Sequence, residues 1–479
     1  MREVWTTSRI RAAEDVVLAR TRPGALMRRA AFAVAVHAAR MLRQRTGRIA
    51  GRHVVLLVGA GNNGGDALWS GAFLRRRGVG VTAVLLAPDR AHPDGLAALR
   101  RAGGRVVTAD EPSDAPETAD LAIDGIVGLA AHGGLRPDAA ALVERVAAPI
   151  LAVDLPSGVE PDTGAVQGPA VTATATVTFG AYKPLHVLSP AAGRCGEVHL
   201  IDIGLRSELG GPDLRVLDAA DVAARLPLPG AADDKYTQGV PGIAAGSSTY
   251  PGAAVLTTGG AVLMKSGMVR YAGSAADVVR ARWPEVIATG SLSDAGRVQA
   301  WVVGPGLGTA SGARETVREV LAAGVPVCAD ADAVNLLAAS PELWDAHDPG
   351  TPLVLTPHER EFARLAGDVG EDRVAAVRAA AKRLGAVVLL KGHSTVIADP
   401  DGHVLVHYTG RSWPATAGSG DVLSGMLGAL LAAGVEPLVA AGCAVWVHDS
   451  AAAIAARGAP APASRMAEAI PAAIRALMR

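Results

Sequence analysis

The sequence predicts an α/β protein with two domains, each a three-layer arrangement of a mainly parallel β-sheet between helices. Short apolar runs typical of buried strands alternate along the chain with stretches whose apolar residues recur at three-to-four spacing, as in helices. Such alternation favours doubly wound sheets. The pattern is interrupted over 206–234, where proline, glycine and aspartate cluster. We therefore expect a first domain over 1–212, a linker over 213–226 and a second domain over 227–479.

The composition argues against several classes of protein. The formal net charge is zero, which is unfavourable for a dominant role in binding nucleic acid or anionic membranes. The three cysteines lie far apart without metal-ligand spacing, so we expect reduced thiols and a cytoplasmic protein. Residues 1–15 contain no apolar signal core. The apolar stretch 427–447 includes Glu436 and Pro437, and we expect it to form buried helices rather than a membrane span.

In the first half, helices are expected within residues 8–46, with a break at Pro23-Gly24. Strands are expected at 53–58, 79–86, 105–107, 121–123, 150–153 and 175–179. Three of these strands run into polar or glycine-rich segments, at 59–66, 124–125 and 154–158. Because ligands of doubly wound sheets bind beyond the carboxyl ends of the strands, these three segments are candidates for one site.

The side chains at these strand ends are mostly hard oxygen ligands. The set comprises Asn62, Asn63, Asp66, Asp124, Asp154 and Ser157. Such groups, beside glycines that let a ligand approach the backbone, are suited to hold a cation and a phosphate-bearing substrate. Two alternatives stay open. Gly59, Gly61 and Gly64 match the dinucleotide fingerprint G-x-G-x-x-G, although no acidic residue stands at the end of the second strand. The second alternative is that each aspartate only caps the helix that follows its strand.

The second half repeats this organisation. Strands are expected at 240–245, 269–271, 300–303, 325–329, 353–355, 387–390 and 395–397. Glycine and polar residues follow several of them, at 246–253, 304–308, 330–335, 356–361 and 391–395. A second mostly parallel sheet flanked by helices is therefore predicted, with its functional residues at the strand ends.

The stretch 414–431 places a glycine-rich loop directly before an apolar helix, with Asp421 at the junction. The backbone N–H groups of Gly418 to Gly420 and the positive end of the helix dipole favour a bound phosphate. Asp421 is suited to accept the proton of a hydroxyl group that attacks phosphorus. The alternative is a tight turn in which Asp421 only caps the helix.

Three segments of the first half resemble the N-terminal epimerase domain of the NAD(P)H-hydrate repair enzymes. They are GNNGGD at 61–66, DGIVG at 124–128 and VDLPSGVEPDTG at 153–164. The resemblance extends over about residues 8–205 and implies a Rossmann-like sheet that acts on hydrated NADH or NADPH. The chain departs from the family at Ala67, where glycine is usual, and in 128–134, which lacks the usual Gly-Thr-Gly.

The resemblance also implies roles for individual residues of the first half. Asn63, Asp124 and Ser157 would hold a potassium ion, and Asp154 would be the catalytic acid and base. The implied substrate contacts are Asn62, Asn63, Gly64, Gly65, Asp66, Gly128, Leu129, Ala130, Ala131, His132, Gly133 and Gly134. The departures at Ala67 and in the loop leave open that the first half is a non-catalytic binding or assembly module.

The ordered motifs of the second half resemble the ribokinase-like superfamily, and within it the ADP-dependent NAD(P)H-hydrate dehydratases. They are KYTQG, TYPGA, GPGLG, DADAVN, LTPHEREFARL, LLKGHSTVI and ATAGSGDVLSG, over about residues 233–479. The resemblance implies that Asp421 is the catalytic base. It assigns the nucleotide to Lys391, Gly392, His393, Ser394, Thr395 and Gly420, and contacts with the hydrate to Ala253, Gly306, His358 and Asp421.

Together the two resemblances imply a bifunctional repair enzyme. The first half would interconvert the R and S epimers of the hydrate, and the second would dehydrate the S epimer with ADP, releasing AMP and phosphate. The implied cofactors are ADP, Mg²⁺ and K⁺, and the partners are small molecules, with neither nucleic acid nor membrane. A homo-oligomer is expected. The alternative is a small-molecule kinase, such as a hydroxymethylpyrimidine-type kinase, with a non-catalytic first half.

Overall fold

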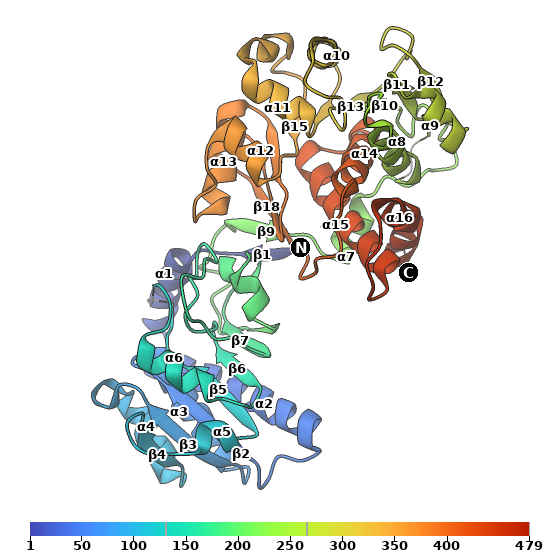
Figure 1. Ribbon diagram of the computed structural model, residues 1–479. Helices are drawn as coiled ribbons and strands as arrows, with labels where there is room; N and C mark the ends of the chain where they lie inside the picture. Colours follow the sequence, from blue (N-terminus) through green and yellow to red (C-terminus); the bar gives the residue numbers. More distant parts are fainter. Residues whose placement is uncertain (130–131, 265–266, 479) are drawn as a thin grey trace. The chain divides into compact units, whose positions relative to one another are not determined.

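The computed structural model describes residues 1–129, 132–264 and 267–478 (Figure 1). The chain divides into two compact units. The N-terminal unit is Glu3–Leu214, and the C-terminal unit is Arg215–Arg479 together with Met1–Arg2. Each unit contains its own β-sheet and its own core, and each is described by itself below.

The N-terminal unit is built on a seven-stranded sheet of order β4-β3-β2-β5-β6-β7-β8, in which every neighbouring pair is parallel. The strands are β2 (His53–Val58), β3 (Gly80–Leu85), β4 (Arg105–Thr108), β5 (Leu121–Gly125), β6 (Ile150–Val153), β7 (Ala175–Phe179) and β8 (Glu197–Ile201). The six strands predicted in this half are present, which confirms the parallel sheet. Strand β8, at the edge, was not predicted.

Helices cover both faces of this sheet, as a doubly wound fold requires (Figure 1). Helices α1 (Thr7–Leu18), α2 (Ala25–Thr46), α3 (Asn62–Arg75) and α4 (Pro93–Arg101) pack on one face. Helices α5 (Ala115–Thr118) and α6 (Pro137–Glu144) pack on the other. The predicted break at Pro23-Gly24 separates α1 from α2, and Gly24 caps α2 with a left-handed φ of 71°.

The C-terminal unit is built on an eleven-stranded sheet of order β1-β9-β18-β17-β16-β15-β14-β13-β10-β11-β12. Its strands are β1 (Arg2–Val4), β9 (Leu214–Val216), β10 (Pro241–Ala244), β11 (Arg270–Ala272), β12 (Ile287–Thr289), β13 (Ala300–Val303), β14 (Val327–Ala329), β15 (Leu353–Leu355), β16 (Val387–Leu390), β17 (Ser394–Ala398) and β18 (Val404–Tyr408). The run from β12 to β16 is parallel. Among the neighbouring strands from β9 to β12, only β17 is antiparallel to its neighbours. The prediction of a mostly parallel sheet is confirmed.

Helices also flank both faces of the second sheet (Figure 1). One face carries α7 (Ala219–Arg225), α8 (Pro251–Leu263), α9 (Ala276–Arg282), α14 (Ser419–Ala432), α15 (Pro437–Ala456) and α16 (Ala463–Leu477). The other carries α10 (Ser311–Leu321), α11 (Asp332–Ala339), α12 (Glu359–Ala366) and α13 (Arg373–Leu384). Short 3₁₀ helices lie at Pro88–Arg90, Pro184–His186, Ala191–Arg194 and Pro341–Ala346.

Helix α14, which begins at the predicted phosphate loop, lies against α8 with very little space between the two backbones. A Cβ added at Gly425 of α14 would lie 1.9 Å from the carbonyl oxygen of Thr257 on α8. One added at Gly260 of α8 would lie 2.2 Å from the carbonyl oxygen of Val422. Glycine at both positions therefore allows the close approach that fixes the direction of α14 and the place of its N-terminus.

The segment predicted as a linker, 213–226, forms ordered structure. Most of it is strand β9 and helix α7, and β9 pairs with β18 through Arg215 and Leu405. Asp218 caps α7 by accepting a 2.9 Å hydrogen bond from the N–H of Asp221. Val222 and Leu226 are buried in the core of the C-terminal unit. These two short elements contain few apolar residues, so the sequence shows little periodicity there.

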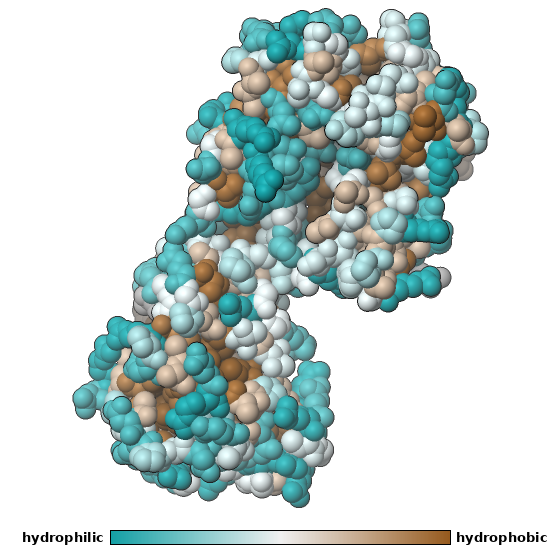
Figure 2. Space-filling view, viewed as in Figure 1, coloured by the Kyte–Doolittle hydropathy of each residue, from teal (hydrophilic) through white to brown (hydrophobic). Residues whose placement is uncertain are grey.

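Helix α15 is long and apolar enough to cross a membrane by length and composition alone, but 61% of its 18-residue apolar window is buried inside the unit. It packs against α14 and α16 in the core. This confirms the interpretation of 427–447 as part of buried helices. On the face seen in Figure 2, hydrophilic and intermediate residues predominate in each unit, and strongly apolar residues occur in separate patches.

Candidate active sites

The carboxyl ends of β2, β5 and β6 meet at one edge of the first sheet, because these strands are direct neighbours. A cavity of about 700 Å³ opens there. Its lining includes the predicted residues Asn62, Asn63, Asp66, Gly128, Leu129 and Asp154. Helix α1 adds Arg11 and Glu14. The structure thus brings residues from three strand ends around one space large enough for a nucleotide-sized ligand.

Other predicted residues of this site contribute space or lie at its margin. A Cβ at Gly64 would lie 2.3 Å from the carbonyl oxygen of Gly59, and one at Gly65 would lie 2.9 Å from the ring of His92. Glycine at 64 therefore allows the start of α3 to approach the end of β2 closely, and glycine at 65 leaves room for the His92 ring. In the following loop, His132 is exposed and its Nδ1 lies 2.8 Å from Oε1 of Glu160. Gly133 has a left-handed φ of 78°, and Gly134 packs near Gly168. The predicted residues Ala130 and Ala131 lie outside the described residues.

Asp154 is buried at the end of β6 and has a left-handed φ of 69°. Non-glycine residues rarely adopt this conformation, and it persists where the surrounding structure enforces it. Here Oδ1 of Asp154 accepts hydrogen bonds from Nζ of Lys183 at 2.6 Å and from Oγ1 of Thr178 at 2.9 Å. The N–H of Phe179 donates to the same oxygen at 3.3 Å. These contacts hold one carboxylate oxygen of Asp154 in place. Asp154 also lines the cavity.

Lys183 is itself only 1% exposed, so its ion pair with Asp154 is fully buried. Its Nζ also donates to Oγ1 of Thr178 at 2.8 Å. A buried ammonium group needs such partners because the loss of hydration is costly. Lys183 therefore belongs to the site as the counter-ion of Asp154.

Asp66 and Glu14 are two further carboxyl groups on the cavity wall. Oδ1 of Asp66 is buried and has no hydrogen-bond partner among the described residues. Burial, with the negative charges of Asp154 and Glu14, raises the pKa of Asp66 well above its ordinary value. Burial and the charge of Asp154 also raise the pKa of Glu14. The cavity therefore combines an ion-paired carboxylate with two carboxyl groups whose pKa values are raised.

The three predicted ligands of a potassium ion lie close together. Ser157 donates to Asp124 through its hydroxyl at 2.7 Å and through its N–H at 2.8 Å. The amide of Asn63 donates to the carbonyl oxygen of Val127 at 3.0 Å, and Oγ of Ser157 accepts from the N–H of Val127 at 3.1 Å. Burial raises the pKa of Asp124, against hydrogen bonds from Ser157 and Ile126 that lower it.

A monovalent cation fits this cluster of residues. Asp124 is 1% exposed, and among the described residues it has neutral hydrogen-bond donors but no ion pair. A cation would offset the charge of this buried carboxylate. The donor set consists of carboxylate, amide and hydroxyl oxygens, which are the ligands that hard cations prefer.

In the C-terminal unit, the start of α14 is shaped by its glycine-rich loop. Gly418 caps the helix with a φ of 82°. Oγ of Ser419 donates to the carbonyl oxygen of Pro414 at 2.6 Å, and Nε2 of His448 lies 3.1 Å from the carbonyl oxygen of Ser419. Burial lowers the pKa of His448 to about 4, so its ring is neutral at pH 7. The helix start, whose first N–H groups have no partners within the helix, is thus held in place.

Asp421 lies half-buried in the first turn of α14. Burial and the negative charges of Asp330 and Asp332 raise its pKa to about 7, while Lys391 opposes the rise. A carboxyl group with a pKa near the working pH is suited to act as a general base. The helix N-terminus beside it is also a place where anions are favoured.

Lys391, Asp330 and Ser424 form a connected group near Asp421. Nζ of Lys391 lies 2.7 Å from Oδ1 of Asp330, and Oγ of Ser424 donates to the other carboxylate oxygen at 2.7 Å. Burial alone would lower the pKa of Lys391, but the charge of Asp330 and the hydrogen bond with it outweigh burial and raise the pKa. Lys391 therefore stays protonated beside the helix start.

The residues predicted to bind the nucleotide occupy different environments. A Cβ at Gly420 would lie 3.4 Å from Nζ of Lys391, so these two residues adjoin. Gly392 and His393 are exposed between β16 and β17. Ser394 and Thr395 are buried at the start of β17, and Oγ1 of Thr395 donates to the carbonyl oxygen of Gly392 at 3.3 Å.

The residues predicted to contact the hydrate also differ in their surroundings. Ala253 and Gly306 adjoin, because a Cβ at Gly306 would lie 2.6 Å from Cβ of Ala253. His358 caps α12: its Nδ1 accepts hydrogen bonds from the N–H groups of Arg360 and Glu361 at 3.1 and 3.2 Å. His358 therefore has a structural role as a helix cap, and its side chain is 51% exposed.

Sequence reasoning did not assign site roles to Lys183, Asp330 or Ser424. The chain contains five lysines against a large excess of arginine, and two of the five, Lys183 and Lys391, form ion pairs with a buried aspartate that follows a strand. Because lysine is rare in this chain, each lysine was a candidate for a specific role, and this could have pointed to Lys183 and Lys391. The hydroxyl of Ser424 lies one helical turn after Gly420, to whose carbonyl oxygen it also donates, at 3.0 Å.

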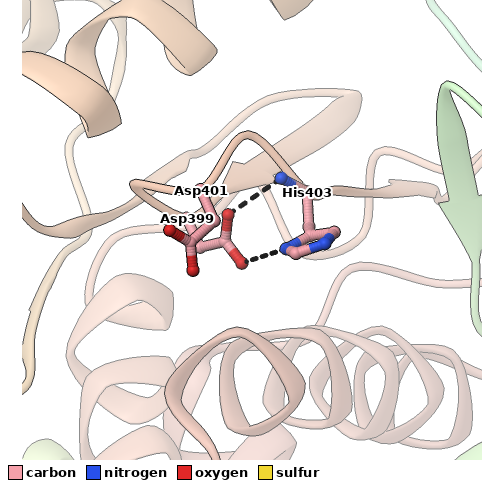
Figure 3. Close-up of side chains that lie close together, drawn as sticks. All are labelled: Asp399, Asp401 and His403. Atoms are coloured by element: carbon pink, nitrogen blue, oxygen red, sulfur yellow. Dashed lines mark hydrogen bonds and ion pairs between the residues drawn. The ribbon is translucent and has the colours of Figure 1, made fainter.

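A third group of titratable residues lies at the turn between β17 and β18 (Figure 3). Asp399, Asp401 and His403 gather there, and the last two are exposed. The carboxylate of Asp399 accepts from the N–H of His403 at 2.8 Å and lies 2.9 Å from its Nδ1. These contacts close the hairpin turn.

Comparisons with known proteins identify both units. A family model described as NAD(P)H-hydrate dehydratase matches residues 242–472, and one described as YjeF-related protein N-terminus matches residues 23–185. The bifunctional NAD(P)H-hydrate repair enzyme Nnr of Mycobacterium leprae is 53% identical over 486 residues, covering 100% of both chains. The chain belongs to the bifunctional NAD(P)H-hydrate repair enzymes. The family predicted from the sequence is thereby confirmed.

Other members of the NAD(P)H-hydrate repair enzyme family match over most of the chain. The enzyme of Mycobacterium tuberculosis is 55% identical over 91% of this chain and 90% of its own length. A ribokinase-like superfamily protein of Enterococcus faecalis, of known structure, is 22% identical with a TM-score of 0.51, and covers 55% of this chain and 96% of its own. The last match concerns the fold alone and agrees with the predicted fold of the second half.

Proposed function

We propose that this chain repairs hydrated NADH and NADPH in two steps. The N-terminal unit interconverts the R and S epimers, and the C-terminal unit dehydrates the S epimer with ADP, giving AMP and phosphate. The second step is supported chiefly by the half-buried carboxyl group of Asp421, which has a pKa of about 7. This group lies at a glycine-rich helix start beside Lys391. Family membership supports both steps.

In the dehydratase step, Asp421 removes the proton of the hydroxyl group as that oxygen attacks the terminal phosphorus of ADP. The N–H groups at the start of α14 and the ammonium group of Lys391 stabilise the charge that develops on the transferred phosphoryl group. Phosphate then leaves from the carbon, and the ring double bond is restored. Because phosphate is a better leaving group than hydroxide, a kinase-like site performs a net dehydration.

The charged groups around each site are suited to metal ions. In the C-terminal unit, Asp330 and Asp332 supply hard oxygen atoms near the phosphate site, and magnesium bound there would neutralise phosphate charge. In the N-terminal unit, Asn63, Asp124 and Ser157 would hold potassium, which would offset the charge of Asp124.

The decisive test assays the purified R and S hydrates separately, with and without ADP. We expect ADP to restore the absorbance of NADH from the S hydrate directly, and from the R hydrate only as fast as the epimerase supplies S. A stable phosphorylated product would instead support the small-molecule kinase. Consumption of R no faster than spontaneous epimerisation would support the non-catalytic first half.

The dehydratase rate should depend on the protonation of Asp421. Burial raises its pKa to about 7, so the fraction that can accept a proton falls as the pH drops below this value. We therefore expect kcat/KM for the S hydrate to fall about tenfold per pH unit below pH 6 and to level off above pH 8. A profile that is flat between pH 5 and 8 would contradict the role of Asp421 as base.

Gly420→Val should weaken nucleotide binding. Cβ of the new side chain would lie 3.4 Å from Nζ of Lys391 and 3.8 Å from Oδ2 of Asp330, and its methyl groups would extend into the space beside the helix start. We expect the Kd for ADP to rise by about tenfold or more, since the amide groups there would be shielded from phosphate. Calorimetric titration measures the affinity, and an unchanged Kd would contradict the assigned phosphate site.

We also propose that the chain is a cytoplasmic homo-oligomer. Its three cysteines are free and buried, as is usual in a reducing compartment. Strand β8 is an edge strand and exposes Leu200, and Val36 of α2 is exposed as well. An unpaired edge with apolar side chains is a common site of self-association. Sedimentation velocity measures the mass in solution, and a monomer at micromolar concentration would contradict the oligomer.

A further inference from the structure

The cavity of the N-terminal unit contains more carboxyl groups than binding a nucleotide requires. Asp66, Asp154 and Glu14 all line it, although a phosphate-bearing ligand repels negative charge. Besides burial, the negative charges of Asp154 and Glu14 raise the pKa of Asp66, and the charge of Asp154 raises the pKa of Glu14. Several carboxyl groups gathered in one cavity are typical of a site that moves protons.

Asp154 is arranged as a proton acceptor. The described hydrogen bonds to its side chain, from Lys183, Thr178 and the N–H of Phe179, all end on Oδ1. The second oxygen, Oδ2, therefore remains for the cavity that Asp154 lines. The buried ammonium group of Lys183 lies 2.6 Å from Oδ1 and offsets the negative charge of the carboxylate.

Asp66 is arranged in the opposite way. It is 6% exposed, its Oδ1 has no hydrogen-bond partner among the described residues, and it faces the same cavity. No basic residue is ion-paired with it in the described part of the chain. A buried carboxyl group without a partner avoids the cost of an isolated charge by keeping its proton.

We propose that Asp66 is the proton donor of the epimerase reaction and that Asp154, held by Lys183, is the proton acceptor. This inference rests on the proposed epimerase function and deepens it. The opposite environments of the two carboxyl groups are the reason for the division of roles. Asp66 is then a catalytic residue rather than only a substrate contact.

The reaction balances with these two groups and water. Asp66 donates its proton to the hydroxyl oxygen on the hydrated carbon, the C–O bond breaks, and water leaves. The lone pair of the adjacent ring nitrogen forms a C–N double bond, which carries the positive charge between the two carboxylates. Water then adds to the opposite face of the carbon and transfers one proton to Asp154, and the electron pair returns to nitrogen. Proton exchange with solvent restores both groups.

The test compares full-length wild type with Asp66→Asn and Glu14→Gln. Conversion of R to S hydrate without ADP is followed by chromatography and corrected for the spontaneous rate. For Asp66→Asn we expect kcat to fall about 100-fold or more with KM within about twofold, because a general acid is lost while the side chain keeps its shape. For Glu14→Gln we expect a loss below about fivefold. Asp110→Asn, an exposed change after β4, is the matched control.

Two further readouts separate catalysis from folding. ADP-dependent conversion of the S hydrate by the C-terminal unit of the same variant should equal that of wild type, and the thermal midpoint of Asp66→Asn should not fall, since its Oδ1 has no partner to lose. Epimerisation by Asp66→Asn within about threefold of wild type would overturn this inference alone, as would a 100-fold loss confined to Glu14→Gln. Absence of epimerisation by wild type would overturn the proposed function as well.

Discussion

Asp421→Asn should lower ADP-dependent dehydration of the S hydrate by about 10²–10⁴-fold, the range found when a general base is removed. Asparagine has the same size as aspartate but cannot accept the proton of the attacking hydroxyl group. The nucleotide should still bind, because the N–H groups at the start of α14 and the Lys391 ammonium group are unchanged. The measurement is single-turnover formation of NADH with saturating ADP.

The same substitution should leave the fold intact. The folded protein raises the pKa of Asp421 from 3.8 to about 7, so between these values the folded state holds a proton that the unfolded state has lost. By linkage, the carboxyl reduces stability progressively as the pH rises through this window. Asparagine removes that cost, and calorimetry at pH 8 should give an unfolding temperature equal to or above that of wild type.

Asp401→Asn serves as the control for Asp421→Asn, because Asp401 is an exposed aspartate of the same unit, at the turn after β17. It should leave the dehydratase rate unchanged. Retention of more than a tenth of the wild-type rate by Asp421→Asn would contradict the role of Asp421 as base. A fall in its unfolding temperature would contradict the electrostatic account of its pKa.

The strands that carry both sites were predictable because they are buried on both faces. A central parallel strand such as β2 (His53–Val58) is a continuous apolar run, and the glycine and polar residues that follow it mark its carboxyl end. Edge strand β8 (Glu197–Ile201) gives no such signal, since its residues are exposed or half-buried. The sequence pattern therefore located the strand ends around each site but not the edge of the first sheet.

The ion pairs Lys183–Asp154 and Lys391–Asp330 could not be predicted from periodicity. Lys183 follows Asp154 by 29 positions and Lys391 follows Asp330 by 61, and neither separation corresponds to a helical or strand period. The first pair also depends on the left-handed backbone at Asp154, which a local pattern does not specify for a non-glycine residue. Only the packing of the strand ends brings these charges together.

Lys183→Met should strongly destabilise the N-terminal unit. Methionine fills a similar volume, but the carboxylate of Asp154 loses its ion pair while both it and its surroundings remain buried. Removing one partner of a buried pair costs about 3–5 kcal/mol. We expect unfolding of this unit at lower denaturant concentration, together with a loss of epimerase activity, while Lys382→Met, at an exposed lysine of α13, should change neither.

A double variant separates the energetic role of the pair from its role in catalysis. In Lys183→Met with Asp154→Asn, no unpaired charge remains, so much of the lost free energy of unfolding should return, giving a coupling of about 2–3 kcal/mol between the two positions. Epimerase activity should not return, because the proton acceptor is gone. Recovery of both stability and activity would contradict the assignment of Asp154. Recovery of stability alone would mean that the protein keeps this buried ion pair for proton transfer rather than for its fold.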